Sequence, residues 1–400
     1  MQTNGWDTVY ALSFACLNQN LAQKSLGFPN QISDRDPTSP FTITAQLGAW
    51  QVGNGSSAQI LSVTIPIASG TLEDQDKGTF PLAGINLSMD VALEILSQGQ
   101  QMSLKFNLQA VNPVQVVNPG NLSELQQLGL LDAAAAYLSA NAASIDYEFA
   151  SINAATQNAP AWLVAQASNY TTVNGFLVIL CSTKSSNIAA LPPVADPSMI
   201  AAGDTAAFLM SGDLFLTDVV LPGLATSMGI KTPAQPFIFN PGTHAIENNG
   251  EVELPGVKKG LITYTPKLTS YSMTVTGANL VSYSAISCSA GLGASANVSI
   301  TANNTVQFDA ASKTLQVVAD PNPTIHKDNS IPWYELMMGI VFEILVPILV
   351  NGVATAVTKD MSNVRIAGLS TQSVAWTGAG NFEVTNGGIN DAVYLQGAWG

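Results

Sequence analysis

The sequence predicts an α+β protein in which a few long helices are covered by highly curved antiparallel sheets. Hydrophobic periodicity separates four helical segments from longer segments that alternate apolar and polar residues. Strands covered on both faces read as continuous apolar runs, so this alternation indicates antiparallel sheets with one face in water. Because the helices are few and the strands come in groups, the order argues against a repeated β-α-β unit.

The alternating segments include "PFTITAQLGAWQV" and "AQILSVTIPIASGTL" in the first half of the chain, and "ITYTPKLTSYSMTVTG" in the second. The predicted helices are recognised by apolar residues three, four or seven positions apart. Gly27 and Pro29 stop the first helix, Pro222 bends the third, and Ser330 suits the N-cap of the fourth. The four helices cover residues 6–26, 122–143, 197–229 and 332–358.

The length of 400 residues suggests two domains or one elongated body. We expect an N-terminal half of helix and antiparallel sheet at residues 1–190. The C-terminal half, residues 191–400, holds two long apolar helices at about 197–229 and 332–358, wrapped by sheet. A single continuous elongated unit is the alternative.

The net charge of −14 excludes several classes of partner. Only 13 Lys and Arg oppose 27 Asp and Glu, and no basic run could neutralise phosphates. We therefore expect no nucleic-acid binding, and no attraction to anionic membranes by bulk charge. The first residues show no basic segment before an apolar run, so we expect cytoplasmic synthesis without a Sec signal peptide; later release from the cell stays open.

Residues for catalysis or metal binding are scarce. The two histidines, His244 and His326, lie in turn-rich segments, and no Gly-x-Ser-x-Gly or His-Glu-x-x-His motif is present. The three cysteines are widely spaced, which favours buried thiols over a metal site. The carboxylates of "TLEDQDKGT" (Glu73, Asp74 and Asp76) read as a solvated hairpin tip. We expect no catalytic residue, metal or cofactor, and keep a hydrolase as a remote alternative.

The stretch "ELMMGIVFEILVPILVNGVATAV", residues 335–357, is long enough to cross a bilayer. Its small and polar residues fall on one i, i+4 line that includes Glu343 and Asn351. A lone carboxylate at mid-bilayer is costly, and no Lys/Arg cluster sets a topology. We therefore expect no transmembrane segment, but an internal helix buried nearly all round, bent near Glu343 by Pro347.

An apolar helix of about 39 Å needs a cover, which curved antiparallel strands can provide. A seam where the sheet fails to close would leave room for an acyl chain. Candidate residues for the lining of such a hydrophobic groove come from the third and fourth helices, although packed core is the simpler interpretation of each. They are Phe208, Leu216, Val220, Leu336, Ile340, Ile344 and Ile348.

Several phrases resemble one family. They are "TNGWDTVYALSF", "WQVGNGSSAQILSVTIPIASGTL" with "LAGINLSMDVALEIL", "LCSTKSSNIAALPPVADPSMI" and "YTPKLTSYSMTVTGANLVSYSA". The chain resembles, over most of its length, the forty-seven-kilodalton and OrfX accessory proteins encoded beside clostridial botulinum-type neurotoxins. The resemblance implies the tubular lipid-binding fold of the bactericidal permeability-increasing protein. It also implies a non-toxic bacterial companion of a toxin, with no family ligand residues to carry over.

Two hypotheses of different classes follow. In the first, the chain is a non-enzymatic accessory protein of a toxin gene cluster that binds lipid or another hydrophobic small molecule in its groove. In the second, the interior is solid and the chain is a scaffold that docks a toxin or a sister protein without lipid. Lipid carried by the purified chain would favour the first, and partner binding without lipid the second.

Overall fold

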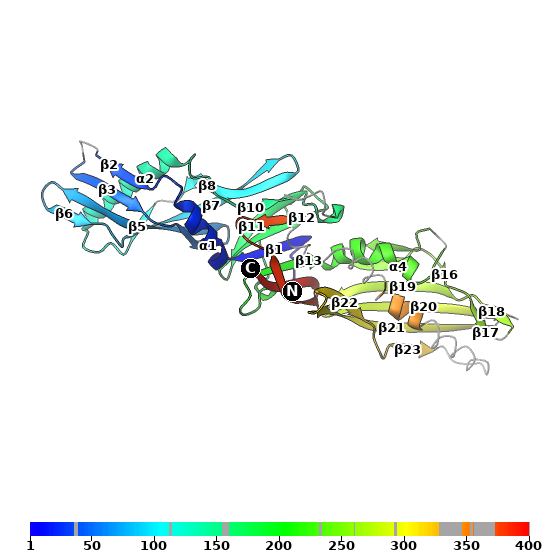
Figure 1. Ribbon diagram of the computed structural model, residues 1–400. Coiled ribbons are helices and arrows are strands. Elements are labelled where there is room, and N and C mark those ends of the chain that lie inside the picture. Colours follow the sequence, from blue (N-terminus) through cyan, green and yellow to red (C-terminus); the bar gives the residue numbers. More distant parts are fainter. Residues whose placement is uncertain are drawn as a thin grey trace. The chain divides into compact units, whose positions relative to one another are not determined.

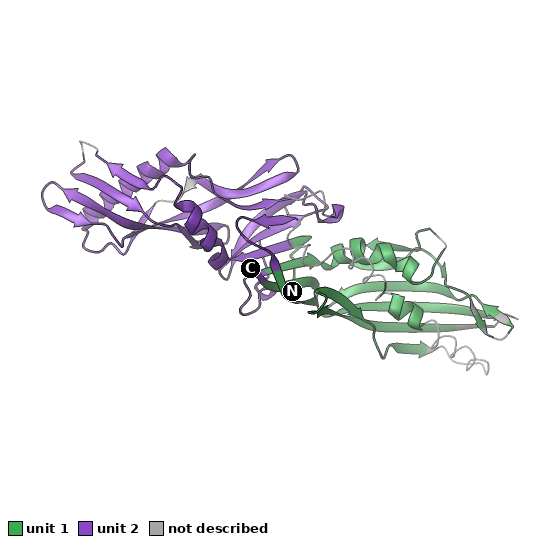
Figure 2. Cartoon of the chain, viewed as in Figure 1, with its two compact units in different colours: residues 1–8, 207–370, 383–397 green, residues 9–206, 371–382, 398–400 purple. Residues whose placement is uncertain are grey.

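The chain forms two compact units in a computed structural model that describes residues 1–35, 39–111, 114–153, 160–231, 234–259, 261–291, 294–327, 346–352, 355 and 373–399. Figure 2 shows the two units in different colours. Unit 1 consists of Met1–Thr8, Ala207–Ser370 and Glu383–Gly397, and unit 2 of Val9–Ala206, Thr371–Phe382 and Ala398–Gly400. Both units are therefore discontinuous in sequence, which differs from a division into two consecutive halves at residue 190.

Unit 2 contains a sheet with the strand order β2-β3-β5-β7-β8-β10-β24, to which β4, β6 and β9 add at the sides (Figure 1). A second group of strands has the order β11-β12-β1. The strands are β1 (Thr8–Ser13), β2 (Gln31–Asp34), β3 (Phe41–Leu47), β4 (Gln51–Asn54), β5 (Ile60–Asp74), β6 (Gly78–Pro81), β7 (Asn86–Gln98), β8 (Gln101–Val111), β9 (Gln115–Val117), β10 (Glu148–Ile152), β11 (Ala167–Val173), β12 (Phe176–Ser182) and β24 (Val374–Trp376). The helices are α1 (Phe14–Ser25), α2 (Glu124–Asn141) and the 3-10 turns Ala161–Leu163 and Pro197–Met199.

Unit 1 has the strand order β13-β26-β25-β21-β20-β19-β15-β14, with β22 and β23 paired to β21 and β16 to β19. A separate hairpin joins β17 and β18. The strands are β13 (Ala206–Ser211), β14 (Phe237–Asn240), β15 (Ala245–Asn248), β16 (Val252–Glu253), β17 (Val257–Lys259), β18 (Ile262–Tyr264), β19 (Lys267–Thr276), β20 (Asn279–Gly291), β21 (Ala294–Asp309), β22 (Thr314–Val318), β23 (Thr324–Lys327), β25 (Phe382–Asn390) and β26 (Ala392–Trp399). The helical elements are α3 (Gly212–Leu214), the π-helix Phe215–Val220 and α4 (Leu221–Ser227).

The registers of neighbouring strands are antiparallel, and the alternation read from the sequence matches burial. In β5 the residues from Leu61 to Ile67 alternate between buried and half-buried, and β3 shows the same pattern. The prediction of an α+β protein dominated by antiparallel sheets is therefore confirmed. The expected helix over residues 122–143 is confirmed as α2.

Two expected helices, residues 6–26 and 197–229, were wrong at their beginnings. The first contains the strand β1, and the second begins with the 3-10 turn Pro197–Met199 and continues into the strand β13. In both, the α-helical part begins only after the serine that ends the strand. β1 is buried along its whole length, and such continuous apolar runs cannot be told from a buried helix by periodicity. Ser13 accepts a hydrogen bond from the Cys16 N–H at 3.3 Å, and Ser211 accepts one from the Leu214 N–H at 3.2 Å. Both serines therefore cap the helix that follows.

The core of unit 2 contains a chain of aromatic contacts. Phe106 contacts Trp50, Tyr147 and Phe149, with ring centroids 6.3, 6.1 and 4.8 Å apart. Trp50 in turn meets Phe28 edge-on at 5.4 Å. Aromatic pairs at these distances add to the stabilisation from apolar burial. They join the connection after α1 to strands that follow it much later in the sequence.

Asp74 corrects the expectation of a fully solvated hairpin tip. Its side chain is 9% exposed, and Oδ2 accepts a hydrogen bond from the Gln126 side-chain amide of α2 at 2.8 Å. Oδ1 accepts from the backbone N–H groups of Asp76 and Lys77. These bonds, chiefly that from Gln126, lower the pKa of Asp74. The carboxylate therefore joins the end of β5 to the first turn of α2.

The lowered pKa gives a pH-dependent contribution to stability. A carboxyl whose folded pKa is depressed stabilises the fold above its unfolded pKa, and this stabilisation is lost as the pH falls through the folded value. We expect Asp74→Asn to lower the free energy of unfolding near pH 6, and the difference from the parent to shrink below about pH 4. Urea unfolding at both pH values measures this. An equal loss at the two pH values would contradict the role of the charge.

Candidate functional site

Three of the predicted groove residues are fully buried in unit 1. Phe208 lies in β13 and not in a helix, and its side chain is 0% exposed. Leu216 and Val220 belong to the π-helix and are 1% and 0% exposed. These three side chains are therefore shielded from solvent, and Leu216 also borders the cavity described below. Leu336, Ile340 and Ile344 fall outside the described residues, while Ile348 is half-buried in a helical segment, residues 346–352.

The described end of the fourth predicted helix contacts the end of the third. A Cβ placed on Gly352 would lie 3.1 Å from Cγ of Met228, the residue that follows α4. Leu349 and Val350 are buried, but Asn351 and Thr355 are exposed. The expectation of burial nearly all round is thus wrong at this end, where polar residues face water. Among the described residues, no helix combines the length and apolar character that crossing a bilayer requires. Glu343 and its predicted bend lie outside the described residues.

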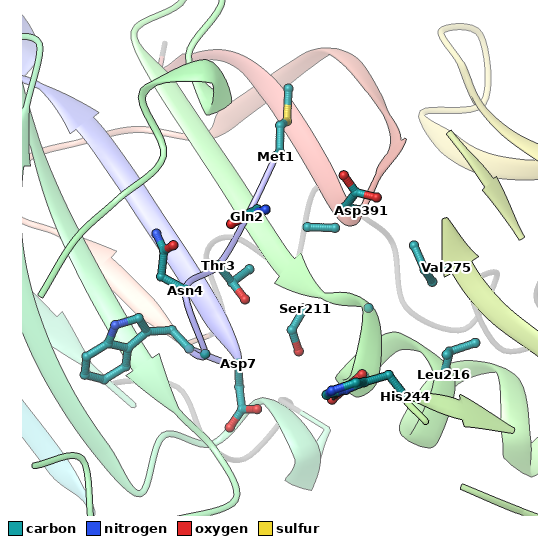
Figure 3. Close-up of a pocket in the computed structure, with 15 residues that line it drawn as sticks. Met1, Gln2, Thr3, Asn4, Asp7, Ser211, Leu216, His244, Val275 and Asp391 are labelled. Carbon is teal, nitrogen blue, oxygen red and sulfur yellow. Dashed lines mark hydrogen bonds and ion pairs between the residues drawn. The ribbon is translucent and has the colours of Figure 1, made fainter. Parts of the chain in front are cut away.

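An open cavity of about 550 Å³ lies in unit 1 where β13 ends and the helical elements begin. Its size is within the range of small-molecule sites. Figure 3 shows residues of the N-terminal segment on one side, and His244, Leu216 and Val275 on the other. The lining also includes Ser211, Gly212 and Asp213, which form the start of α3.

Ser211, Asp213 and His244 provide the residue types of a hydrolytic triad in this cavity. His244 Nδ1 lies 2.8 Å from Asp213 Oδ2, and their side chains are 70% and 40% exposed. The Ser211 hydroxyl, however, is the N-cap that accepts the Leu214 N–H, and no hydrogen bond joins this hydroxyl to His244 in the described structure. A nucleophile needs contact with its base, so the three residues do not form a triad here. His326 is exposed on β23, away from this lining.

Other polar groups in the lining have structural roles. Asp391 accepts a hydrogen bond from the Gly277 N–H at 2.7 Å, and its own N–H donates to the Gly277 carbonyl at 2.9 Å. Both residues have positive φ, so this pair fixes two turns against each other. His244 also has positive φ, at the turn between β14 and β15. The carboxylates therefore do not form a ready metal site, and the described residues contain no cluster of three potential metal ligands.

The second candidate site is the exposed side of α2 in unit 2. One side of this helix packs on β2, β3, β5 and β9, so tightly that a Cβ on Gly129 would lie 2.4 Å from the Phe41 ring. On the opposite side Leu125 and Leu128 are 58% and 57% exposed. The α2 outer face is defined by Leu125, Leu128, Leu131, Ala135 and Ala136. Solvent-facing apolar side chains at helical spacing are typical of a binding surface.

A family model described as "Protein OrfX2/OrfX3/P47" matches residues 3–375 of the chain. The chain belongs to the OrfX-like family. Protein P47 of Clostridium botulinum (strain Kyoto / Type A2) is 24% identical over 416 positions, covering 99% of both chains. The family description names no enzymatic activity.

Two solved structures have the same fold as this OrfX-like protein. P47 from Clostridium botulinum A2 matches with a TM-score of 0.79 at 22% identity, over 100% of this chain and 98% of that one. P47 of Clostridium botulinum E1 matches with a TM-score of 0.74 at 18% identity, over 99% and 100%. At identities this low, the matches show a shared fold and do not identify functional residues in this chain.

Neither candidate site of this OrfX-like chain is predicted by a motif in its sequence. The cavity depends on residues from five separate segments, which no local pattern brings together. The α2 outer face did leave a signal. In α2 the outward positions Leu125 and Leu128 are apolar, and so are the buried positions, which include Leu130. A helix that is apolar on both sides needs a second surface to cover it.

The capping role of Ser211 can be separated from a catalytic role. We expect Ser211→Ala to lower the free energy of unfolding by about 1 kcal/mol, because the Leu214 N–H loses its acceptor. Ser211→Asn should restore most of that stability, since Asn is an equally good N-cap that cannot act as a nucleophile. Chemical denaturation of the three proteins gives the comparison. Equal stability of the Ala and Asn variants would disprove the capping role.

Proposed function

We propose that this OrfX-like protein is a non-enzymatic accessory protein of a toxin gene cluster, and that it docks a toxin or sister protein through the α2 outer face. The exposure of Leu125 and Leu128 carries this proposal. Family membership supports the accessory role, and the burial of Phe208 and Val220 is compatible with a solid interior. Synthesis in the cytoplasm, followed by release from the cell, belongs to the same proposal.

The α2 outer face suits a protein partner with an apolar groove or helix. Leu125 and Leu128 are one turn apart, and the next turns carry alanines that permit close approach. Asp132 and Glu124 are exposed on the same side, so a docked partner must leave these carboxylates in water or provide cations that pair with them. Completing the burial of each leucine contributes on the order of 1 kcal/mol, which makes the pair a small hot spot.

A lipid or other hydrophobic ligand is the second candidate. The contact of Gly352 with Met228 favours it, because the third and fourth helices must lie together to line a groove. Ile348 is only half-buried beside this contact. In this alternative the chain is a tubular lipid-binding protein that resembles the bactericidal permeability-increasing protein.

Docking through α2 can be tested by pull-down with the products of neighbouring genes, using protein stripped of lipid. We expect Leu125→Asp with Leu128→Asp to weaken partner binding about ten-fold or more, since two charges would enter an apolar contact. Val194→Asp, at a side chain 51% exposed in the same unit, is the matched control. Binding that survives the double substitution would exclude the α2 outer face.

Native mass spectrometry decides the second candidate. A ligand groove predicts an added lipid mass on the purified chain, and its loss in Ile348→Asp with the fold intact. Chain that neither carries nor accepts lipid or detergent would disprove the groove. The two measurements are independent, because partner docking is measured without lipid and lipid mass without partner.

A further inference from the structure

An open cavity of about 610 Å³ lies in unit 2 on the outer face of the paired strands β5 and β7 (Figure 1). Its volume is within the range of small-molecule sites. Ser62 of β5 lies between the buried residues Leu61 and Val63, so its hydroxyl points to the outer face, and Asp90 of β7 is directly opposite. The polar lining residues are Asn54, Ser56, Ser62, Ser88, Asp90 and Gln115.

This lining combines two amides, three hydroxyls and one carboxylate. Each amide and each hydroxyl can both donate and accept hydrogen bonds, whereas the ionised Asp90 side chain only accepts. The Oγ atoms of Ser62 and Ser88 lie 3.5 Å apart, so neighbouring strands bring their hydroxyls together. An acyl chain in this cavity would take all these groups out of water without replacing their hydrogen bonds. The lining therefore suits a ligand with many hydroxyl groups.

The carboxylate of this cavity is held in place before any ligand binds. Asp90 Oδ2 accepts a hydrogen bond from the backbone N–H of Ser56, in the turn between β4 and β5, at 3.2 Å. The same turn is attached to β11, because the Thr172 N–H donates to the Ala58 carbonyl at 2.6 Å. A site whose polar groups are already positioned loses less entropy on binding than a flexible one.

The space in the cavity depends on small side chains. Gly53 of β4 lies opposite Ser62 in the antiparallel register. A Cβ placed on Gly53 would meet no heavy atom within 4 Å, so the space above this position is open. Serines at Ser62 and Ser88 keep the neighbouring strands equally low. A larger side chain at Gly53 would therefore reduce the cavity without disturbing the packing below it.

We propose that this cavity binds a short neutral saccharide. Asp90 accepts hydrogen bonds from sugar hydroxyls, and the amides of Asn54 and Gln115 donate to and accept from others. An anionic ligand would be repelled by Asp90, the one charged side chain of the described lining, and by the net charge of −14. A simple cation would leave the hydroxyls and amides unused. None of the lining residues belongs to α2, so this site is independent of docking through the α2 outer face.

The affinity for a single saccharide should be low. None of the described lining residues is aromatic, so no ring can stack on the face of the sugar. Each hydrogen bond to the ligand replaces one to water, and its net contribution is small. A dissociation constant in the millimolar range is therefore expected.

Saturation-transfer NMR of the full chain tests the proposal with free glucose, galactose, mannose and N-acetylglucosamine at millimolar concentration. We expect saturation transfer to at least one of these sugars. A microarray of glycans that end in the same four sugars is the second arm. Binding in solution alone indicates a soluble sugar, and binding on the array indicates the end of a glycan chain. Either result supports a saccharide site.

Substitutions then locate the binding. Asp90→Ala should lower the association constant about ten-fold, because a hydrogen bond to a charged group is lost. Asp90→Asn should lose less, since its amide oxygen still accepts from the Ser56 N–H. Gly53→Leu should have an effect as large as that of Asp90→Ala, because it fills the cavity. Glu94→Ala is the matched control, at a half-buried carboxylate on the same strand and face but outside the lining.

Three results would overturn the proposal. Absence of binding to all four sugars in both arms excludes a saccharide site, and unchanged binding in both Asp90→Ala and Gly53→Leu excludes this cavity. Stronger binding to a glycan once sialic acid is added to its end excludes a neutral ligand. The Leu125→Asp and Leu128→Asp double variant should keep its saccharide binding, so failure of the docking proposal is measured separately. Circular dichroism of every variant confirms that the fold is retained.

Discussion

Each unit depends on one long strand that must pair on both edges while burying only one face. In unit 2 this strand is β5, whose first part pairs with β4 and β7 and whose second part pairs with β3 and β6. The pairing partners of β5 change between Pro66 and Ile67. Pro66 has no N–H to donate to a neighbouring strand. In unit 1 β21 has the same role, pairing with β20, β22, β23 and β25. Period-two alternation along these strands fixes the register of all their neighbours.

Helices cover the buried faces in both units, and they begin in the same manner. β1 and β13 each end at a serine whose hydroxyl caps the next helix, and the serine N–H donates to a carbonyl of the same unit: Ser13 to Thr205 and Ser211 to Asp7. These junctions place the helices so that their large side chains fill the interior. Phe208, Leu216 and Val220 are among these buried side chains, whereas Leu125 and Leu128 on the outer side of α2 remain exposed.

The sequence pattern predicts strands correctly where only one face of the strand is buried. Where both faces are buried, it does not distinguish a strand from a helix. Alternation predicted β3, β5 and β21 because one face of each meets water. The same reasoning missed β1 and β13, since a wholly buried strand shows no period that differs from a buried helix. For the same reason it placed Phe208 in a helix, although this residue lies in β13. The cavity near His244 and the role of Asp74 needed contacts between distant segments, which no spacing along the chain encodes.

The discontinuity of the units also has a consequence for biosynthesis. Unit 1 combines Met1–Thr8 with Glu383–Gly397, and unit 2 takes Thr371–Phe382 from near the other end of the chain. Neither unit can therefore close before the ribosome has made almost the whole polypeptide, although domains generally fold as they emerge. Strands such as β25 and β26 are synthesised after the other strands of their sheet. Until they pair, the sheet edges that they will occupy are open, and open edges are sites of aggregation. The nascent chain should accordingly depend on holding chaperones until synthesis ends.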